Sequence, residues 1–205
     1  MKGKTIPVTT LLLVGSAVAV HVIPGVAAAL IFDRAAIAGG EWWRMVTGNW
    51  VHLSMSHLVY DALAVLIAGW LLERDGAPLR SIVLASAGAV GLAVLLGLPG
   101  IARFGGLSGV VFALVAYLAL SGLRERGAWR FLCLTTLLVI AAKLCFELST
   151  GRFLLVPTDD EIIAVPLVHA VGMAVALVVY SIERAGQRAP RRAVTLSTSS
   201  SRSMI

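Results

Sequence analysis

Long apolar runs separated by short polar segments dominate this chain. A helix needs about 20 mainly apolar residues to cross a bilayer, and six runs approach or exceed that length. They cover residues 6–32, 51–72, 81–102, 104–123, 131–148 and 162–182. Four of these runs contain no Asp, Glu, Lys or Arg, whereas 51–72 and 131–148 contain ionisable residues. The pattern predicts an all-α membrane protein, a bundle of six transmembrane helices.

Composition supports a membrane environment. The 205 residues are 59% hydrophobic and only 14% charged, whereas soluble domains contain about 25% charged residues. A soluble fold of this size has too little interior to hide so much apolar surface. A soluble enzyme, a disordered chain and a small disulfide-stapled domain are therefore excluded. Cys133 and Cys145 lie twelve residues apart in one predicted helix, roughly 18 Å, which is beyond disulfide reach.

The 17 Lys and Arg residues are unevenly divided between the two sides of the predicted bundle. With a cytoplasmic N-terminus, twelve lie in cytoplasmic segments, four in outer segments and one, Lys143, inside a span. Cytoplasmic segments of membrane proteins carry such an excess, so both termini are predicted to be cytoplasmic. The same distribution explains the net charge of +6 without nucleic acid as a partner.

The chain divides into two predicted parts. Residues 1–183 form the six-helix membrane domain, and residues 184–205, rich in Arg, Ser and Thr, form a basic, disordered cytoplasmic tail. Lys2 and Lys4 before an apolar run also resemble a cleavable signal peptide. Cleavage there would leave five spans, so we favour an uncleaved first span.

Ionisable and polar residues inside spans are costly and indicate functional sites. His57, Ser108 and His169 lie near the beginning of the second, fourth and sixth predicted spans, all of which enter from the outer side. At 1.5 Å per residue, His57 and His169 lie roughly 10 Å below the beginning of their runs. The run with Ser108 opens with Gly105 and Gly106, so we expect its helix to begin below the membrane surface. The three residues are thus predicted to share one layer.

A serine and a histidine at one depth can act as a nucleophile and its general base. Gly106 lets the backbone turn sharply before Ser108 and leaves N–H groups free to stabilise an oxyanion. Small residues at Gly109 and Gly172 would let the fourth and sixth spans approach closely. Taken singly, a Gly-x-Ser-Gly sequence is usually a packing motif, and a membrane histidine often makes only an interhelical hydrogen bond. The shared depth favours the catalytic interpretation.

Four motifs follow one another in a specific order. They are Glu41-Trp42-Trp43-Arg44, then His52 and His57, then Gly106-Leu107-Ser108-Gly109, then His169-Ala-Val-Gly172. Together, over residues 1–183, they resemble the rhomboid family of intramembrane serine proteases. The resemblance implies that Ser108 is the nucleophile and His169 the general base and acid. No carboxylate stands in register with His169, which fits a dyad and not a triad.

The resemblance also implies roles for residues around the dyad. His57 and the Ser108 backbone N–H would stabilise the oxyanion beside Gly106, and His52 would be a structural histidine near the mouth of the second span. Trp42 and Trp43 would belong to the first outer loop, where they also fit an interfacial anchor.

One position departs from the family pattern. Four residues after His57 the family usually has Asn, and this chain has Asp61. An ionised carboxylate cannot donate a hydrogen bond to an oxyanion. Asp61 is either protonated in its low-dielectric site or paired with His57, keeping that ring cationic and donating. We favour the pairing with His57.

Three further groups of polar residues have simpler interpretations. Lys143 and Glu147 form either a self-neutralising pair or a polar lining that meets substrate or stabilises the following loop, and we favour the pair. His21 is expected to be a helix-contact or kink residue. No metal-binding spacing occurs among the histidines, and the expected chemistry needs no metal or cofactor.

The resemblance extends to a subgroup. The compact chain and the segment Lys143-Leu-Cys-Phe-Glu147-Leu-Ser-Thr-Gly151 resemble rhombosortase. This resemblance implies a serine endopeptidase of the bacterial inner membrane with its active site facing the periplasm. Its partners would be the lipid bilayer and membrane-protein substrates with a transmembrane segment, specifically C-terminal Gly-Gly sorting tails. The alternative is a non-proteolytic rhomboid-like module that binds membrane segments; a small channel or transporter is disfavoured because no inverted repeat is visible.

Overall fold

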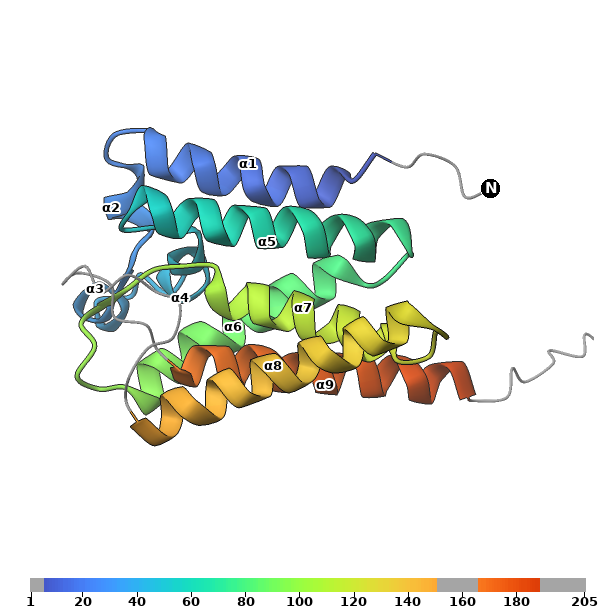
Figure 1. Cartoon of the computed structure of the whole chain (residues 1–205). Helices are drawn as coiled ribbons and strands as arrows, with labels where there is room; N and C mark the ends of the chain where they lie inside the picture. Colours follow the sequence, from blue (N-terminus) through green and yellow to red (C-terminus); the bar gives the residue numbers. More distant parts are fainter. Residues whose placement is uncertain (1–5, 151–165, 189–205) are drawn as a thin grey trace, which may run out of the picture.

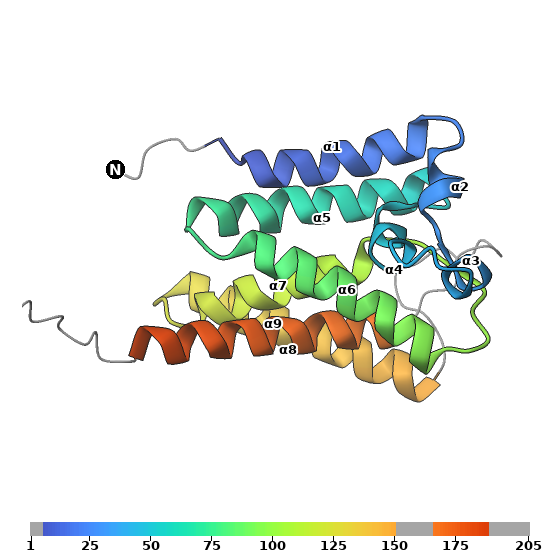
Figure 2. The same ribbon diagram turned by 180° about the vertical axis from the view of Figure 1, so that it is seen from behind.

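The structure, a computed structural model, describes residues 6–150 and 166–188. Six longer helices form a bundle with roughly parallel axes (Figures 1 and 2). They are α1 (Val8–Val22), α5 (Met55–Arg74), α6 (Leu79–Gly97), α7 (Ser108–Gly122), α8 (Ala128–Thr150) and α9 (Pro166–Arg188). Short elements lie between α1 and α5 and after α6. They are α2 (Val26–Leu30), β1 (Phe32–Asp33), α3 (Arg34–Ala38), α4 (Arg44–Thr47), the 3-10 helix η1 (Gly48–Trp50) and β2 (Arg103–Phe104).

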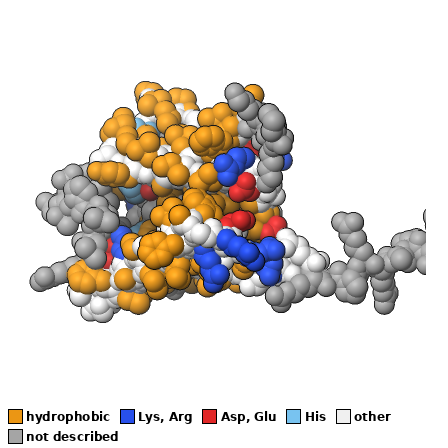
Figure 3. Space-filling view, turned by 45° about the vertical axis from the view of Figure 1, so that its right-hand side comes forward, with side chains coloured by type: hydrophobic (Ala, Val, Ile, Leu, Met, Phe, Trp, Pro, Cys, Tyr) orange, Lys and Arg blue, Asp and Glu red, His pale blue; other side chains and the backbone are white. Residues whose placement is uncertain are grey.

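Four of these helices, α5, α6, α8 and α9, are long and apolar enough to cross a membrane. Helices α1 and α7 are apolar but have only 15 residues each, roughly 22 Å at 1.5 Å per residue, less than the ~30 Å of a hydrocarbon core. Apolar side chains cover much of the face shown in Figure 3. Leu12, Leu96 and Phe131 are among the exposed apolar residues of the structure, each about 70% exposed. Such a surface suits lipid, which explains the hydrophobic composition.

Helix α7 occupies the middle of the bundle and packs against α5, α6, α8 and α9. Gly109, Ala113 and Ala116 are among its buried residues. Small side chains here let the neighbouring backbones come close. A short, surrounded helix also places its first residue, Ser108, inside the bundle, in line with the predicted late start.

The first apolar run is not one long helix. Helix α1 ends at Val22, because Pro24 has no backbone N–H to donate and Gly25 adopts a positive φ of 81°. The chain then forms the short elements α2 to η1, which lie at the end of the bundle where α1 ends and α5 begins (Figure 1). Against α6, the loop carbonyl of Met45 lies 2.0 Å from the position of a Cβ on Gly91, so only glycine allows this packing.

Arg34 ties this loop to the end of α6. Its guanidinium donates hydrogen bonds of 2.7–3.1 Å to the carbonyls of Val94, Leu95, Leu98 and Ile101. Helices leave their last four carbonyls without intrahelical partners, and Arg34 donates to two of those of α6, at Val94 and Leu95. The loop and the end of α6 are thereby fixed to each other.

A two-stranded antiparallel ladder joins the same loop to the segment before α7. Phe32 pairs with Phe104 and Asp33 with Arg103, and the Arg103 Nε atom donates to Asp33 Oδ2 at 3.0 Å. The Ala36 backbone N–H and the Arg103 side chain lower the pKa of the Asp33 carboxyl below its ordinary value. This ladder fixes the approach to the Gly105-Gly106 turn.

The described chain begins and ends at the same end of the bundle (Figures 1 and 2). Helix α9 continues through Arg188, whereas the predicted tail begins at residue 184. Residues 189–205 of that tail, and residues 162–165 of the sixth predicted span, lie outside the described residues. Cys133 and Cys145 are both free thiols on α8, as their spacing predicts.

Candidate active site

Three helices bring the residues of the predicted catalytic layer to one end of the bundle. Helices α5, α7 and α9 all begin at the same end, on the left in Figure 1. Ser108 is the first residue of α7, and His57 and His169 lie in the first turns of α5 and α9. His57 is held there by an N-cap, because its backbone N–H donates to the Ser54 hydroxyl at 3.2 Å. The common layer inferred by counting residues thus corresponds to a common end of three helices.

The turn before Ser108 requires glycine at two successive positions. A Cβ on Gly105 would lie 2.6 Å from the Val51 carbonyl oxygen. Gly106 has a φ of 137°, and a Cβ there would lie 2.6 Å from His57 Cε1. The His57 ring therefore rests directly on the backbone that leads into Ser108, where an oxyanion would need donors. Ser108 itself is only partly buried.

Helices α7 and α9 touch through their backbones immediately beside Ser108 and His169. A Cβ on Gly172 would lie 2.0 Å from the Gly109 carbonyl oxygen, and one on Gly109 would lie 3.1 Å from the Val168 carbonyl oxygen. The close approach predicted from the small residues is confirmed. Among the described residues no hydrogen bond joins the Ser108 hydroxyl to the His169 ring; catalytic hydrogen bonds often tighten only when substrate binds.

The His169 ring is buried and held on one face by an aromatic side chain. It is only 5% exposed, and Phe112 of α7 stacks on it with ring centroids 4.2 Å apart and planes 12° from parallel. Phe112 follows Ser108 by one helical turn, so α7 supplies both the hydroxyl and the surface against which the imidazole lies. Sequence reasoning missed Phe112, although its spacing of four residues from Ser108 places it on the same helix face.

A carboxylate lies beside His169, contrary to the sequence-based expectation. Glu147 Oε2 of α8 is 3.6 Å from His169 Nδ1, and Glu147 Oε1 accepts a hydrogen bond from Lys143 Nζ. The expected Lys143–Glu147 pair is thus confirmed, but the expectation that no carboxylate stands near His169 is wrong. The sequence shows no carboxylate in register with His169, but Glu147 reaches its ring from the neighbouring helix α8.

Asp61 joins two histidines into a cluster at the start of α5. Its Oδ2 atom lies 3.1 Å from His52 Nε2 and 3.3 Å from His57 Nε2, and the two rings meet edge to face. His52 Nδ1 lies 3.2 Å from the Trp50 carbonyl oxygen. The pairing of Asp61 with His57 is therefore present, and His52, expected only as a structural residue, shares the same carboxylate.

The remaining predicted residues have mostly structural neighbours. His21, in the last turn of α1, has its Nδ1 atom 3.1 Å from the His52 carbonyl oxygen, so this contact is with the segment between η1 and α5 and not with a helix. Trp42 and Trp43 are more than half exposed, and the adjacent Arg44 bonds Glu41 at 2.6 Å. Exposed tryptophans beside an arginine fit an interfacial anchor. Within residues 6–150 and 166–188, no group of three or more His, Cys, Asp or Glu is arranged to hold a metal ion.

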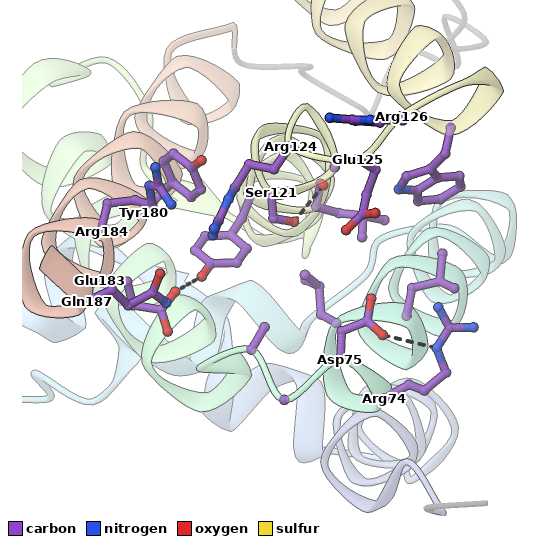
Figure 4. Close-up of a pocket in the computed structure, with 18 residues that line it drawn as sticks. Arg74, Asp75, Ser121, Arg124, Glu125, Arg126, Tyr180, Glu183, Arg184 and Gln187 are labelled. Atoms are coloured by element: carbon purple, nitrogen blue, oxygen red, sulfur yellow. Dashed lines mark hydrogen bonds and ion pairs between the residues drawn. The ribbon is translucent and has the colours of Figure 1, made fainter. Parts of the chain in front are cut away.

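A hollow of about 910 Å³ opens at the end of the bundle opposite Ser108 (Figure 4). Charged residues dominate its rim, including Arg74, Asp75 and Arg124; Figure 3 shows such charges gathered over this end. Inside it the Tyr117 hydroxyl donates to the Glu183 carboxylate. The hydroxyl of Ser121, in the lining, donates to a carbonyl of its own helix, and among the described residues no histidine lines the hollow.

The comparisons with known proteins agree with this arrangement. Residues 39–183 match the family model described as Rhomboid domain, which is more than half of the 205-residue chain. The chain belongs to the rhomboid family. No curated protein matches it in sequence. Rhomboid proteins are generally intramembrane serine proteases, and the matched region of this rhomboid protein includes Ser108, His169, His57 and Asp61.

Proposed function

We propose that this rhomboid protein is an intramembrane serine endopeptidase in which Ser108 and His169 form the catalytic pair. The observation that carries the proposal is the backbone contact between Gly109 and Gly172. It brings the helices of Ser108 and His169 together at the end where His57 lies against the turn before Ser108. Membership of a family of serine proteases supports the same assignment.

The proposed reaction is acyl transfer to serine followed by hydrolysis. Ser108 Oγ attacks the peptide carbonyl while His169 Nε2 accepts its proton, and the imidazolium then protonates the leaving amine. Water, deprotonated by the same nitrogen, releases the acyl group and restores the hydroxyl. The Ser108 backbone N–H and the His57 ring, held by Asp61 and by contact with Gly106, would stabilise the oxyanion.

The substrates we propose are membrane proteins with a transmembrane segment that is cleaved near the outer face of the membrane. Helical backbone must unwind before it can reach a serine, and small residues such as glycine make unwinding less costly. The rhombosortase-like features favour C-terminal Gly-Gly sorting tails followed by an apolar helix and an arginine cluster. The proposed location is a bacterial inner membrane, with six spans, cytoplasmic termini and the site facing the periplasm.

A fluorophosphonate probe tests the chemistry without a known substrate. We expect the wild-type protein in detergent to be labelled and Ser108→Ala to be unlabelled at the same melting temperature. Co-expression with a reporter that ends in a Gly-Gly, apolar-helix and arginine-cluster tail tests the substrate class through a size shift that Ser108→Ala abolishes. A well-folded wild type that reacts with neither would overturn the proposal and favour a non-proteolytic module that binds membrane segments.

A further inference from the structure

Glu147 occupies an unusual place on α8. The buried residues of this helix are Cys133 and Glu147, and much of the rest of the helix is exposed apolar surface suited to lipid. The Glu147 side chain is fully buried. A buried carboxylate without compensation costs several kcal/mol, so its partners define what it does.

The two oxygens of Glu147 have different partners. Oε1 accepts from Lys143 Nζ, one turn earlier on α8, while Oε2 faces His169 Nδ1 of α9 at 3.6 Å. No hydrogen bond joins these two atoms at that distance, and a shift of about half an ångström would form one. The carboxylate thus bridges a permanent cation and the ring proposed as the general base.

Phe112 completes the setting of the imidazole. Its ring stacks on His169, and Lys143 Nζ lies 5.6 Å from the centroid of the same Phe112 ring. Lys143 therefore contacts both Glu147 and Phe112, and each of these two residues contacts the His169 ring. An imidazole fixed on one face by stacking and at Nδ1 by a carboxylate has one ring nitrogen left for chemistry, Nε2.

We infer that Glu147 is a positioning residue for His169, so that the catalytic group is a Ser108–His169–Glu147 triad assembled from three helices. Glu147 holds the neutral ring with its proton on Nδ1, which leaves the Nε2 lone pair to accept the Ser108 proton. It then stabilises the imidazolium that forms, and remains ionised throughout. Lys143 fixes the carboxylate and offsets its charge. The inference rests on the proposed function for its catalytic part.

Labelling kinetics test that catalytic part. Glu147→Gln keeps the shape of the side chain and removes its charge. We expect its maximal rate of fluorophosphonate labelling to fall about 10- to 100-fold, the range of a charge-assisted hydrogen bond, with half-saturation by the probe unchanged. The matched control is Glu183→Gln, which removes a carboxylate that bonds across helices at the opposite end of the bundle and should label at the wild-type rate.

Nitrogen NMR tests the positioning without any catalysis. In bilayers at a pH where histidines are neutral, ¹⁵N-histidine protein should show His169 protonated at Nδ1, with the signal assigned by its loss in His169→Gln. Glu147→Leu, which cannot accept a hydrogen bond, should lose this tautomer preference. An unchanged tautomer in Glu147→Leu, or wild-type labelling by a folded Glu147→Gln, overturns the inference. A well-folded wild type that neither reacts with the probe nor cleaves the reporter overturns the proposed function instead, while the NMR result still decides the role of Glu147.

Discussion

The His57 ring lies against the backbone of Gly106, so close that a Cβ at Gly106 would be 2.6 Å from His57 Cε1. Gly106 also has a φ of 137°, a conformation that residues with side chains rarely adopt. The same glycine therefore shapes the turn before Ser108 and leaves room for the ring proposed to face the oxyanion. Substitutions can separate the cost of the positive φ from the displacement of the His57 ring.

Gly106→Ala should fold less stably and lose most of its activity. The positive φ costs about 1–3 kcal/mol with a side chain, and displacement of His57 should lower fluorophosphonate labelling by roughly 100-fold, as misplacements of about 1 Å do. Gly40→Ala is the control, because Gly40 has a φ of 106° with open space around it. It should lower the melting temperature similarly but label normally, and wild-type labelling by folded Gly106→Ala would contradict the assigned role of His57.

Gly172→Ala should separate α7 from α9. The added Cβ would meet the Gly109 carbonyl oxygen at 2.0 Å, and backbone atoms cannot move aside as a flexible side chain can. Overpacking of this kind costs about 1–3 kcal/mol, so we expect a lower melting temperature and loss of labelling together. Gly186→Ala, on the same helix with nothing within 4 Å, should be neutral or slightly stabilising. Equal behaviour of the two variants would show that the α7–α9 contact is not needed.

Asp61→Ala should reduce cleavage much more than Asp61→Asn. The asparagine amide oxygen can still accept from the His52 or His57 ring, whereas alanine leaves the buried His52 ring and the partly exposed His57 ring without that partner, a loss of about 1–3 kcal/mol. We therefore expect labelling by the alanine variant to be at least roughly 10-fold slower than by the asparagine variant. Wild-type rates in both variants would remove Asp61 from the mechanism.

The sequence predicted the layer of polar residues better than the lengths of the helices. Counting from the start of each apolar run placed His57, Ser108 and His169 together, and α5, α7 and α9 do begin at one end. The prediction that residues 6–32 form one long helix was wrong, because hydropathy does not detect the helix end before Pro24-Gly25. Helix α1 is therefore shorter than its run, whereas the late start of α7 after Gly105-Gly106 was predicted.

Neighbours from other helices were beyond the reach of sequence reasoning. Lys143 and Glu147 are four residues apart, so their pairing follows from helix geometry. The contact of Glu147 with His169 depends instead on how α8 turns toward α9. His52 shares Asp61 with His57 for a similar reason, because the loop before α5 folds back onto that helix.

By itself the sequence determined the membrane environment, the order of the chemical groups along the chain and the small residues, Gly109 and Gly172, that let two spans approach closely. Those properties follow from hydropathy and helical periodicity, which are local. Only the tertiary structure decided which carboxylate faces which imidazole, because the rotation of each helix about its own axis is set by its packing with all the others.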